Sequence, residues 1–212
     1  FASVFGKAVS LMRLDCRSLE YKYFPFDPKG YKLVLLNSLV KHELASSAYN
    51  DRRKSCENVV AVMKKHWPEV ETLRDATYDM LDEIRDEISE EDALRAKYVI
   101  GEKYRVLEVC VALEEGDYEE VGKKMYETHR GLSKEYEVSC PELDFLNDVA
   151  HSCGVTGSRI MGGGFGGCTI NLVSEDLYAN FIETAKKAYK EKYGKEPIVI
   201  DVVIGDGARK LC

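Results

Sequence analysis

Glycine is concentrated in one short stretch of this chain. Residues 162–167 contain five glycines around Phe165. Glycine reaches positive φ at little cost and lets the backbone approach a neighbour closely. Successive main-chain N–H groups in such a turn can also converge on an anion. The stretch therefore predicts either a loop that contacts a phosphate or substrate, or a glycine-rich hairpin packed closely against its neighbours. Spacing alone leaves both open.

Two nucleotide-binding motifs are excluded by the residues after the glycines. Gly162, Gly164 and Gly167 fit G-x-G-x-x-G, but that fingerprint must open a helix. Here residues 169–173 alternate like a strand, and a helix begins only near Ser174, too far away to hold a pyrophosphate. No Lys-Ser or Lys-Thr pair comes after the glycines, so the loop is not a Walker A motif.

Composition narrows the class of protein further. The chain has 212 residues, enough for one large domain or one and a half, and a net charge of −7 without a basic stripe. These features argue against non-specific nucleic-acid binding. The apolar runs are too short to cross a membrane. Seven cysteines and four histidines are scattered, which favours reduced thiols in a cytoplasmic protein and no metal site built from these residues.

The periodicity of apolar residues predicts an α+β fold. Strands are expected in residues 9–14, 19–24 and 31–36, and a β-turn at residues 27–30. The tail predicts a strand at 168–173, a helix at 175–192 and a strand at 197–204. Two strands joined through a helix either pair in parallel or lie apart in a split βαβ unit.

The region from residue 45 to about residue 153 is expected to be helical. Pro68 ends one helix, Ser89 caps another, and Gly116-Asp117 separates two more. Pro141 suits the first turn of a further helix. Residues 106–113 are apolar nearly all round, which predicts a centrally buried helix.

Four segments together carry a resemblance to a known family. They are Asp-Cys-Arg-Ser-Leu-Glu at 15–20, the block at 40–53, the run at 136–144, and the glycine-rich segment at 157–168. In this order they resemble the GHMP sugar and metabolite kinases, and the second block is similar to that of the galactokinases among them. The last segment resembles the third GHMP signature.

The resemblance implies a GHMP kinase C-terminal domain, with a ferredoxin-like split βαβ unit and helical additions, at residues 41–212. Residues 1–40 would be strands that complete or border an N-terminal kinase domain. The sugar signature, the ATP loop and the catalytic aspartate of the family are absent from residues 1–212. We therefore expect the C-terminal half of such a kinase, inactive alone. It should expose an apolar surface that promotes self-association.

The family reaction transfers phosphate from ATP to the 1-hydroxyl of α-D-galactose. The resemblance implies that Tyr49 contacts the sugar. If the resemblance is set aside, a tyrosine packed at a helix start is the simpler interpretation. Lys41 gives electrostatic support near the absent carboxylate. The floor of the active site comes from Gly162, Gly163, Gly164, Phe165, Gly166 and Gly167. ATP and Mg²⁺ would be held mainly by the missing half.

Other charged residues have less specific interpretations. Arg159 is expected to pair with an acid or a phosphate, a structural ion pair being the simpler case. The run at residues 51–54 is expected to form a solvated face of mixed charge. Two alternatives for the whole protein stay open at this point. One is a galactose- and ATP-binding sensor without turnover, and the other is a kinase for a related sugar such as N-acetylgalactosamine.

Overall fold

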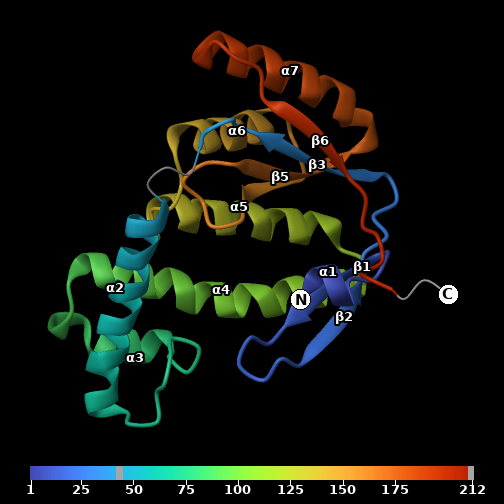
Figure 1. Ribbon diagram of the computed structural model, residues 1–212. Helices are drawn as coiled ribbons and strands as arrows, with labels where there is room; N and C mark the ends of the chain where they lie inside the picture. Colours follow the sequence, from blue (N-terminus) through green and yellow to red (C-terminus); the bar gives the residue numbers. More distant parts are fainter. Residues whose placement is uncertain (42–44, 210–212) are drawn as a thin grey trace.

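A computed structural model describes residues 1–41 and 45–209 (Figure 1). The first forty residues give a short helix and three strands, and a mainly helical region comes next before the chain returns to strands. The elements are α1 (Ala2–Phe5), β1 (Ser10–Leu14), β2 (Tyr21–Pro25), β3 (Tyr31–Asn37), α2 (Ala45–His66), α3 (Tyr78–Glu83), η1 (Arg85–Glu87), α4 (Glu90–Glu115), α5 (Tyr118–Lys134), α6 (Pro141–Ser152), β4 (Gly157–Met161), β5 (Cys168–Ser174), α7 (Glu175–Tyr193) and β6 (Ile198–Val202).

The central sheet has four strands in the order β4-β5-β3-β6, and every neighbouring pair is antiparallel. Because β5 and β6 are both antiparallel to β3, they run in the same direction with β3 between them. The connection through α7 therefore forms a split βαβ unit, one of the two arrangements predicted for the tail. With the helices between β3 and β4, the unit has the β-α-β-β-α-β order of a ferredoxin-like fold, as expected.

The place of β3 corrects one detail of the predicted organisation. The division predicted from the sequence places its residues in segment 1–40, which would complete or border another domain. In the structure, β3 lies between β5 and β6 and pairs with both along most of its length. Only β1 and β2 form a separate two-stranded hairpin. A boundary at residue 40 would cut the first strand from the ferredoxin-like unit; the division into two domains otherwise stays a prediction.

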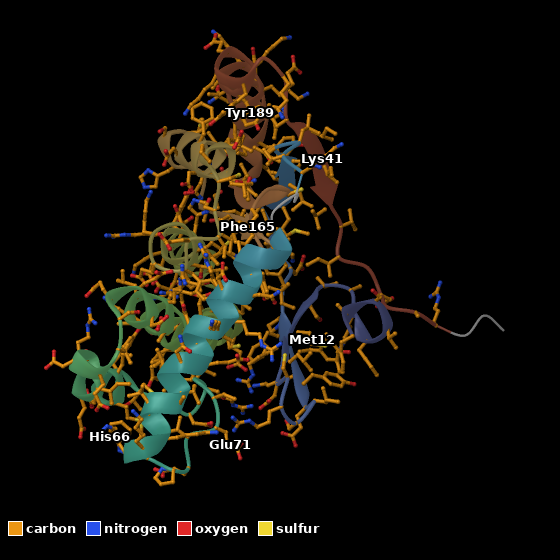
Figure 2. The ribbon with its side chains drawn as sticks, turned by 60° about the vertical axis from the view of Figure 1, so that its left-hand side comes forward. Met12, Lys41, His66, Glu71, Phe165 and Tyr189 are labelled. Atoms are coloured by element: carbon orange, nitrogen blue, oxygen red, sulfur yellow. The ribbon has the colours of Figure 1, made fainter. Side chains whose placement is uncertain are left out.

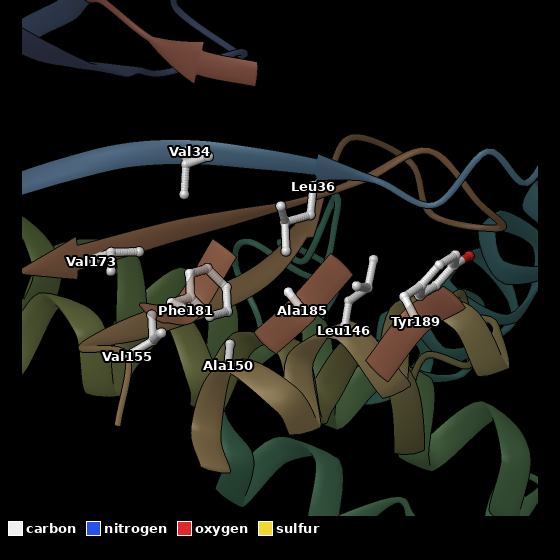
Figure 3. Packing of buried hydrophobic residues seen from close by; sticks show 9 residues of the cluster. All are labelled: Val34, Leu36, Leu146, Ala150, Val155, Val173, Phe181, Ala185 and Tyr189. Atoms are coloured by element: carbon white, nitrogen blue, oxygen red, sulfur yellow. The ribbon is translucent and has the colours of Figure 1, made fainter. Parts of the chain in front are cut away.

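One face of the sheet is covered by α6 and α7 (Figures 1 and 3). Val34 and Leu36 of β3 point into this layer, where they pack with Phe181, Ala185 and Tyr189 of α7. All five are completely buried. Val34 and Leu36 thus lie on the same face of β3, as the alternation of side chains along a strand requires. The Tyr189 hydroxyl, at the end of this core, donates a hydrogen bond of 2.7 Å to the Ser38 carbonyl.

The opposite face packs against α5, and α4 lies beyond it beside the β1–β2 hairpin (Figure 1). A second cluster joins Phe24 and Phe26 to Leu113, Val121 and Leu172. A third cluster, built from α2, α3 and the first half of α4, makes a helical lobe. The helices predicted between residues 45 and 153 therefore fall into two groups, one on the sheet and one beside it.

Most of the predicted boundaries are confirmed by local contacts. The Ser89 hydroxyl accepts a hydrogen bond from the Asp92 N–H at the start of α4. Gly116 ends that helix in the left-handed region (φ +71°), and the Asp117 carboxylate caps α5. α2 ends at His66, two residues before Pro68. These signals were readable because each depends on neighbours within a few residues.

In the middle of the chain one prediction is wrong, and one strand was not predicted. The helix at residues 106–113 is only partly buried, because Val106, Leu107 and Val111 are 47%, 48% and 53% exposed. Strand β4, Gly157–Met161, was not predicted, because its glycine and its polar residues are not typical of a strand.

Among the residues that the structure describes, no helix combines the length and apolar character needed to cross a bilayer.

Candidate functional site

The glycine loop, residues 162–167, is the tip of the hairpin between β4 and β5. A strand therefore stands on each side of it, and α7 begins only at Glu175. This confirms that the loop is not a dinucleotide fingerprint. Gly162, Gly164, Gly167 and Phe165 have φ between +60° and +84°, a region in which glycine is favoured and Phe165 is unusual.

Backbone hydrogen bonds fasten the loop on two sides. The Phe165 N–H donates to the Val138 carbonyl at 2.7 Å, and the Gly167 N–H donates to the Val40 carbonyl at 3.2 Å. A Cβ at Gly164 would collide with the Val138 carbonyl. The loop is thus wedged between the segment after β3 and the segment before α6, as the close-packing interpretation predicted. Two of its N–H groups are committed to protein carbonyls.

Tyr49 lies beside this loop. It sits in the second turn of α2, and its side chain is 51% exposed, so it is not a tyrosine packed away at a helix start. A methyl group built on Gly163 would lie 3.8 Å from Tyr49 Cε2. The structure therefore brings together the tyrosine and the glycine loop from segments more than a hundred residues apart. Their roles stay predictions.

Lys41 is exposed and comes directly after Val40, whose carbonyl receives the Gly167 N–H. Figure 2 shows Lys41 and Phe165 in the same region, near the first turns of α2. Residues 42–44 lie outside the described residues. The chain thus places a cation one residue from an anchor of the loop, and its electrostatic role stays a prediction.

Arg52 departs from the predicted solvated face. Its side chain is only 13% exposed. Its Nε donates to the Tyr136 carbonyl at 3.0 Å, and its guanidinium lies 5.8 Å from the Phe165 ring centroid. Arg53, by contrast, is exposed and pairs with Glu57 one turn along the helix, as expected for that run. The charged run therefore has two faces, and one of them meets the candidate site.

Arg159 of β4 forms no ion pair within 4 Å among the described residues, so the expected structural pair is wrong. It donates a hydrogen bond of 2.8 Å to the Ile160 carbonyl, and burial lowers the pKa of its guanidinium. It lines a cavity of about 450 Å³ between the β1–β2 hairpin, α4, α5 and the sheet. Tyr49 and the glycine loop do not border this cavity.

A partly buried polar cluster fixes the start of α6. The Asp144 carboxylate accepts hydrogen bonds from the hydroxyls of Ser133 and Ser139, at 2.9 and 2.5 Å, and lies 3.2 Å from Nε2 of His129. Burial alone would raise the pKa of Asp144, but the bonds from His129, Ser139 and Ser133 outweigh it and lower the pKa to about 2. The ionised carboxylate ties α5 to α6 just after residues 136–138.

Sequence reasoning missed the contribution of Arg52 and Glu137. A signal for Arg52 was present, because residues three apart share a helix face and Tyr49 is three residues earlier. No local pattern marked Glu137, which adopts φ +53°. Its conformation is set by contacts with α2 and α4 that only the folded chain brings together.

Comparison with known proteins identifies relatives for this arrangement. Residues 110–191 match the family model described as GHMP kinases C terminal. The whole chain is 41% identical over 213 residues to a galactokinase of Clostridium acetobutylicum and 40% identical to a human galactokinase. It covers 54% and 52% of those proteins, so the chain spans about half the length of the curated relatives it matches.

Solved structures agree with this assignment. The crystal structure of Lactococcus lactis galactokinase complexed with galactose matches 98% of this chain with a TM-score of 0.91 and 30% identity, over 54% of its own length. The mevalonate kinase of L. major in complex with R-mevalonate matches 94% of the chain and 50% of its own, with a TM-score of 0.57 and 19% identity. The second likeness concerns the fold alone.

Proposed function

Since this chain belongs to the GHMP kinases and carries their C-terminal domain, we propose that it is the C-terminal part of a galactokinase. The complete protein transfers phosphate from ATP to the 1-hydroxyl of α-D-galactose. The observation that carries the proposal is the alignment of the entire chain with galactokinases at about 40% identity. The placement of Tyr49 against the glycine loop supports it.

In this proposal Tyr49 contacts the sugar. Its exposed phenol can both donate and accept a hydrogen bond, as recognition of a sugar hydroxyl requires. The glycine loop forms the wall beside the ring, where the exposed Gly162 and Gly163 leave room for a ligand. Lys41 supplies positive charge near the transferring phosphoryl group. As an ammonium it acts as a point charge without the two-pronged geometry of arginine.

The remaining machinery is assigned to sequence outside residues 1–212. No group of three or more His, Cys, Asp or Glu side chains suited to a metal ion occurs within the described part of the chain. We infer that the catalytic carboxylate and most contacts to ATP and Mg²⁺ come from an N-terminal half, as phosphoryl transfer requires.

The proposed compartment is the cytoplasm. Each cysteine within the described residues is free, which suits a reducing environment. Cys212 lies outside the described residues.

The test compares the chain alone with the full-length protein that carries it. Galactose-dependent release of ADP is measured with galactose, N-acetylgalactosamine and no sugar. We expect turnover with galactose by the full-length protein and none by residues 1–212. Binding of galactose and ATP by the full-length protein without turnover would overturn the kinase assignment in favour of a sensor. Preferential turnover of N-acetylgalactosamine would overturn the assignment of galactose as the substrate.

A further inference from the structure

Residues 136–138, named the bridge, fill the space between α2 and the glycine loop. The Tyr136 N–H donates to the Gly131 carbonyl and the Val138 N–H to the Leu132 carbonyl, both at 2.9 Å. Glu137, between them, has φ +53°, a left-handed conformation that is uncommon outside glycine. Its backbone is therefore held by surrounding contacts rather than by local preference.

Arg52 makes the contacts that hold the bridge to α2. Besides its bond to the Tyr136 carbonyl, its Nη2 donates to the Glu137 carbonyl at 2.6 Å and lies 3.8 Å from the Glu137 carboxylate. One guanidinium thus binds two successive carbonyls of the bridge. It also lies over the Phe165 ring of the glycine loop, in the range of a cation–π contact.

The same bridge is fastened to α4 and to the loop. The buried Arg95 of α4 lies 3.2 Å from the Glu137 carboxylate and donates to the Ser55 hydroxyl of α2 at 2.8 Å. On the other side, the Val138 carbonyl receives the Phe165 N–H. A continuous set of polar contacts therefore runs from α4 and α2 through the bridge into the glycine loop.

This set of polar contacts connects the two parts of the candidate site, Tyr49 and the glycine loop. Arg52 is three residues after Tyr49 on α2, so both project from one face of the helix. Phe165 is two residues after Gly163, whose added methyl group would contact the Tyr49 ring. Because the loop is bonded to the bridge at Val138 and Tyr49 belongs to α2, a movement of the bridge relative to α2 would change the distance between Tyr49 and the loop.

We propose that Arg52 is a positioning residue that, through residues 136–138, sets the separation between Tyr49 and the glycine loop and so the affinity for the sugar. The inference rests on the proposed function for its sugar-binding part. The coupling between Arg52 and the loop stands on the contacts alone.

The first test measures the coupling in this chain without any reaction. Amide hydrogen exchange is followed in Arg52→Met, Arg52→Lys and the matched control Arg53→Met, whose side chain makes only an exposed ion pair. We expect exchange of the Phe165 N–H to rise at least tenfold in Arg52→Met and less in Arg52→Lys. Exchange of the Gly167 N–H, bonded to Val40 outside the bridge, should change by less than twofold. Equal exchange at Phe165 in the Arg52 and Arg53 variants overturns the coupling.

The second test uses the full-length protein and separates affinity from turnover. In Arg52→Met we expect the KM for galactose to rise about tenfold, equivalent to about 1.4 kcal/mol, with the KM for ATP changed by less than twofold. Arg52→Lys should recover part of the loss, because lysine keeps the charge but not the paired donors. Arg53→Met should match the wild type. A parallel rise in both KM values overturns the positioning role.

A variant that keeps the arginine guards against loss of folding. Glu137→Gln leaves both carbonyls of the bridge in place and removes only the charge held by Arg52 and Arg95. We expect a smaller rise in the KM for galactose, of about threefold. No change in either exchange or KM, in a folded Glu137→Gln protein, counts against the charged part of the bridge. A full-length wild-type protein that neither binds nor phosphorylates galactose overturns the proposed function and the sugar-binding role of Arg52, whereas the exchange measurement still decides the coupling.

Discussion

Gly122 of α5 and Gly157 of β4 touch backbone to backbone. A Cβ at Gly157 would fall 2.5 Å from Cα of Gly122, and one at Gly122 would collide with the Thr156 carbonyl. No side chain separates the helix from the strand at this crossing. The close approach sets the packing distance between β4 and α5, and β4 leads directly into the glycine loop.

Replacing Gly122 with alanine should therefore destabilise the fold. The methyl group meets backbone atoms, which cannot move aside, so we expect a loss of about 1–3 kcal/mol in the free energy of unfolding. Denaturant unfolding of Gly122→Ala measures this. Gly205→Ala is the matched control, because a Cβ there has no atom within 4 Å and its φ is not positive. Similar midpoints for the two variants would contradict the account.

Replacement by alanine should change the stability little at Gly163 and lower it clearly at the neighbouring Gly164. At Gly163 the methyl group meets only the Tyr49 ring, at 3.8 Å, and φ is not positive. Gly163→Ala should keep the stability within about 1 kcal/mol of wild type. At Gly164 the methyl group meets the Val138 carbonyl at φ +82°, and we expect a loss of about 2 kcal/mol or more. Thermal unfolding of both variants is the measurement.

Gly163→Ala also probes the candidate site directly. In the full-length protein the added methyl group occupies space next to Tyr49, so the KM for galactose should rise while the KM for ATP stays unchanged. An unchanged KM for galactose in the folded variant would argue that the sugar does not enter between the ring and the loop.

Acid should weaken the contact between α5 and α6 through Asp144. Its pKa lies at about 2 in the folded chain against 3.8 unfolded, so its ionised form stabilises the fold above about pH 4. That contribution is lost as the pH falls from about 4 to about 2. The full shift corresponds to roughly 2 kcal/mol, and partial exposure reduces this to about 1 kcal/mol. Urea unfolding of Asp144→Asn at pH 7 and at pH 3 measures the contribution.

Asp144→Asn should be less stable than wild type at pH 7, and the difference should shrink at pH 3. The control is Asp148→Asn, at an exposed position on the same helix. A constant difference between Asp144→Asn and wild type across this pH range would exclude the carboxylate as the source.

The exposed apolar side chains of α4 should promote self-association of the isolated chain. Val106, Leu107 and Val111 lie about half exposed along one stretch of the helix, and such patches drive association. Light scattering should therefore give a mass above that of one chain. The double variant Leu107→Glu/Val111→Lys should lower the mass, whereas Leu94→Glu, near the other end of α4, should not. A monomeric wild-type chain would contradict the prediction.

The parts of the fold that were predictable are those determined by near neighbours. The caps at Ser89 and Asp117 and the helix end at Gly116 each depend on residues within one turn. The sheet order was harder to predict, because β3 pairs with strands far along the chain. The pattern of apolar residues in β3 does not indicate which strands pair with it. Strand β4 was missed for a related reason. Its Gly157 serves the contact with α5 rather than strand formation.

For the candidate site, the glycine loop and Tyr49 were predictable as residues, but their proximity was not. Periodicity placed Tyr49 on a helix and the glycines in a turn, and only the resemblance to GHMP kinases joined them. The burial of Arg52 escaped a local interpretation because a run of charges on a helix is usually solvated. Its partners at residues 136–138 come from the other end of the helical region.

The position of β3 in the middle of the sheet also affects synthesis. This strand leaves the ribosome long before β5 and β6, and both of its hydrogen-bonding edges stay unpaired until those strands have been made. Until then its apolar residues and free edges are open to wrong pairing, the state in which nascent chains need protection. The core between the sheet and the layer of α6 and α7 needs residues of β5 and α7 as well as of β3. Assembly of this unit is therefore expected only after β5, α7 and β6 have all been synthesised.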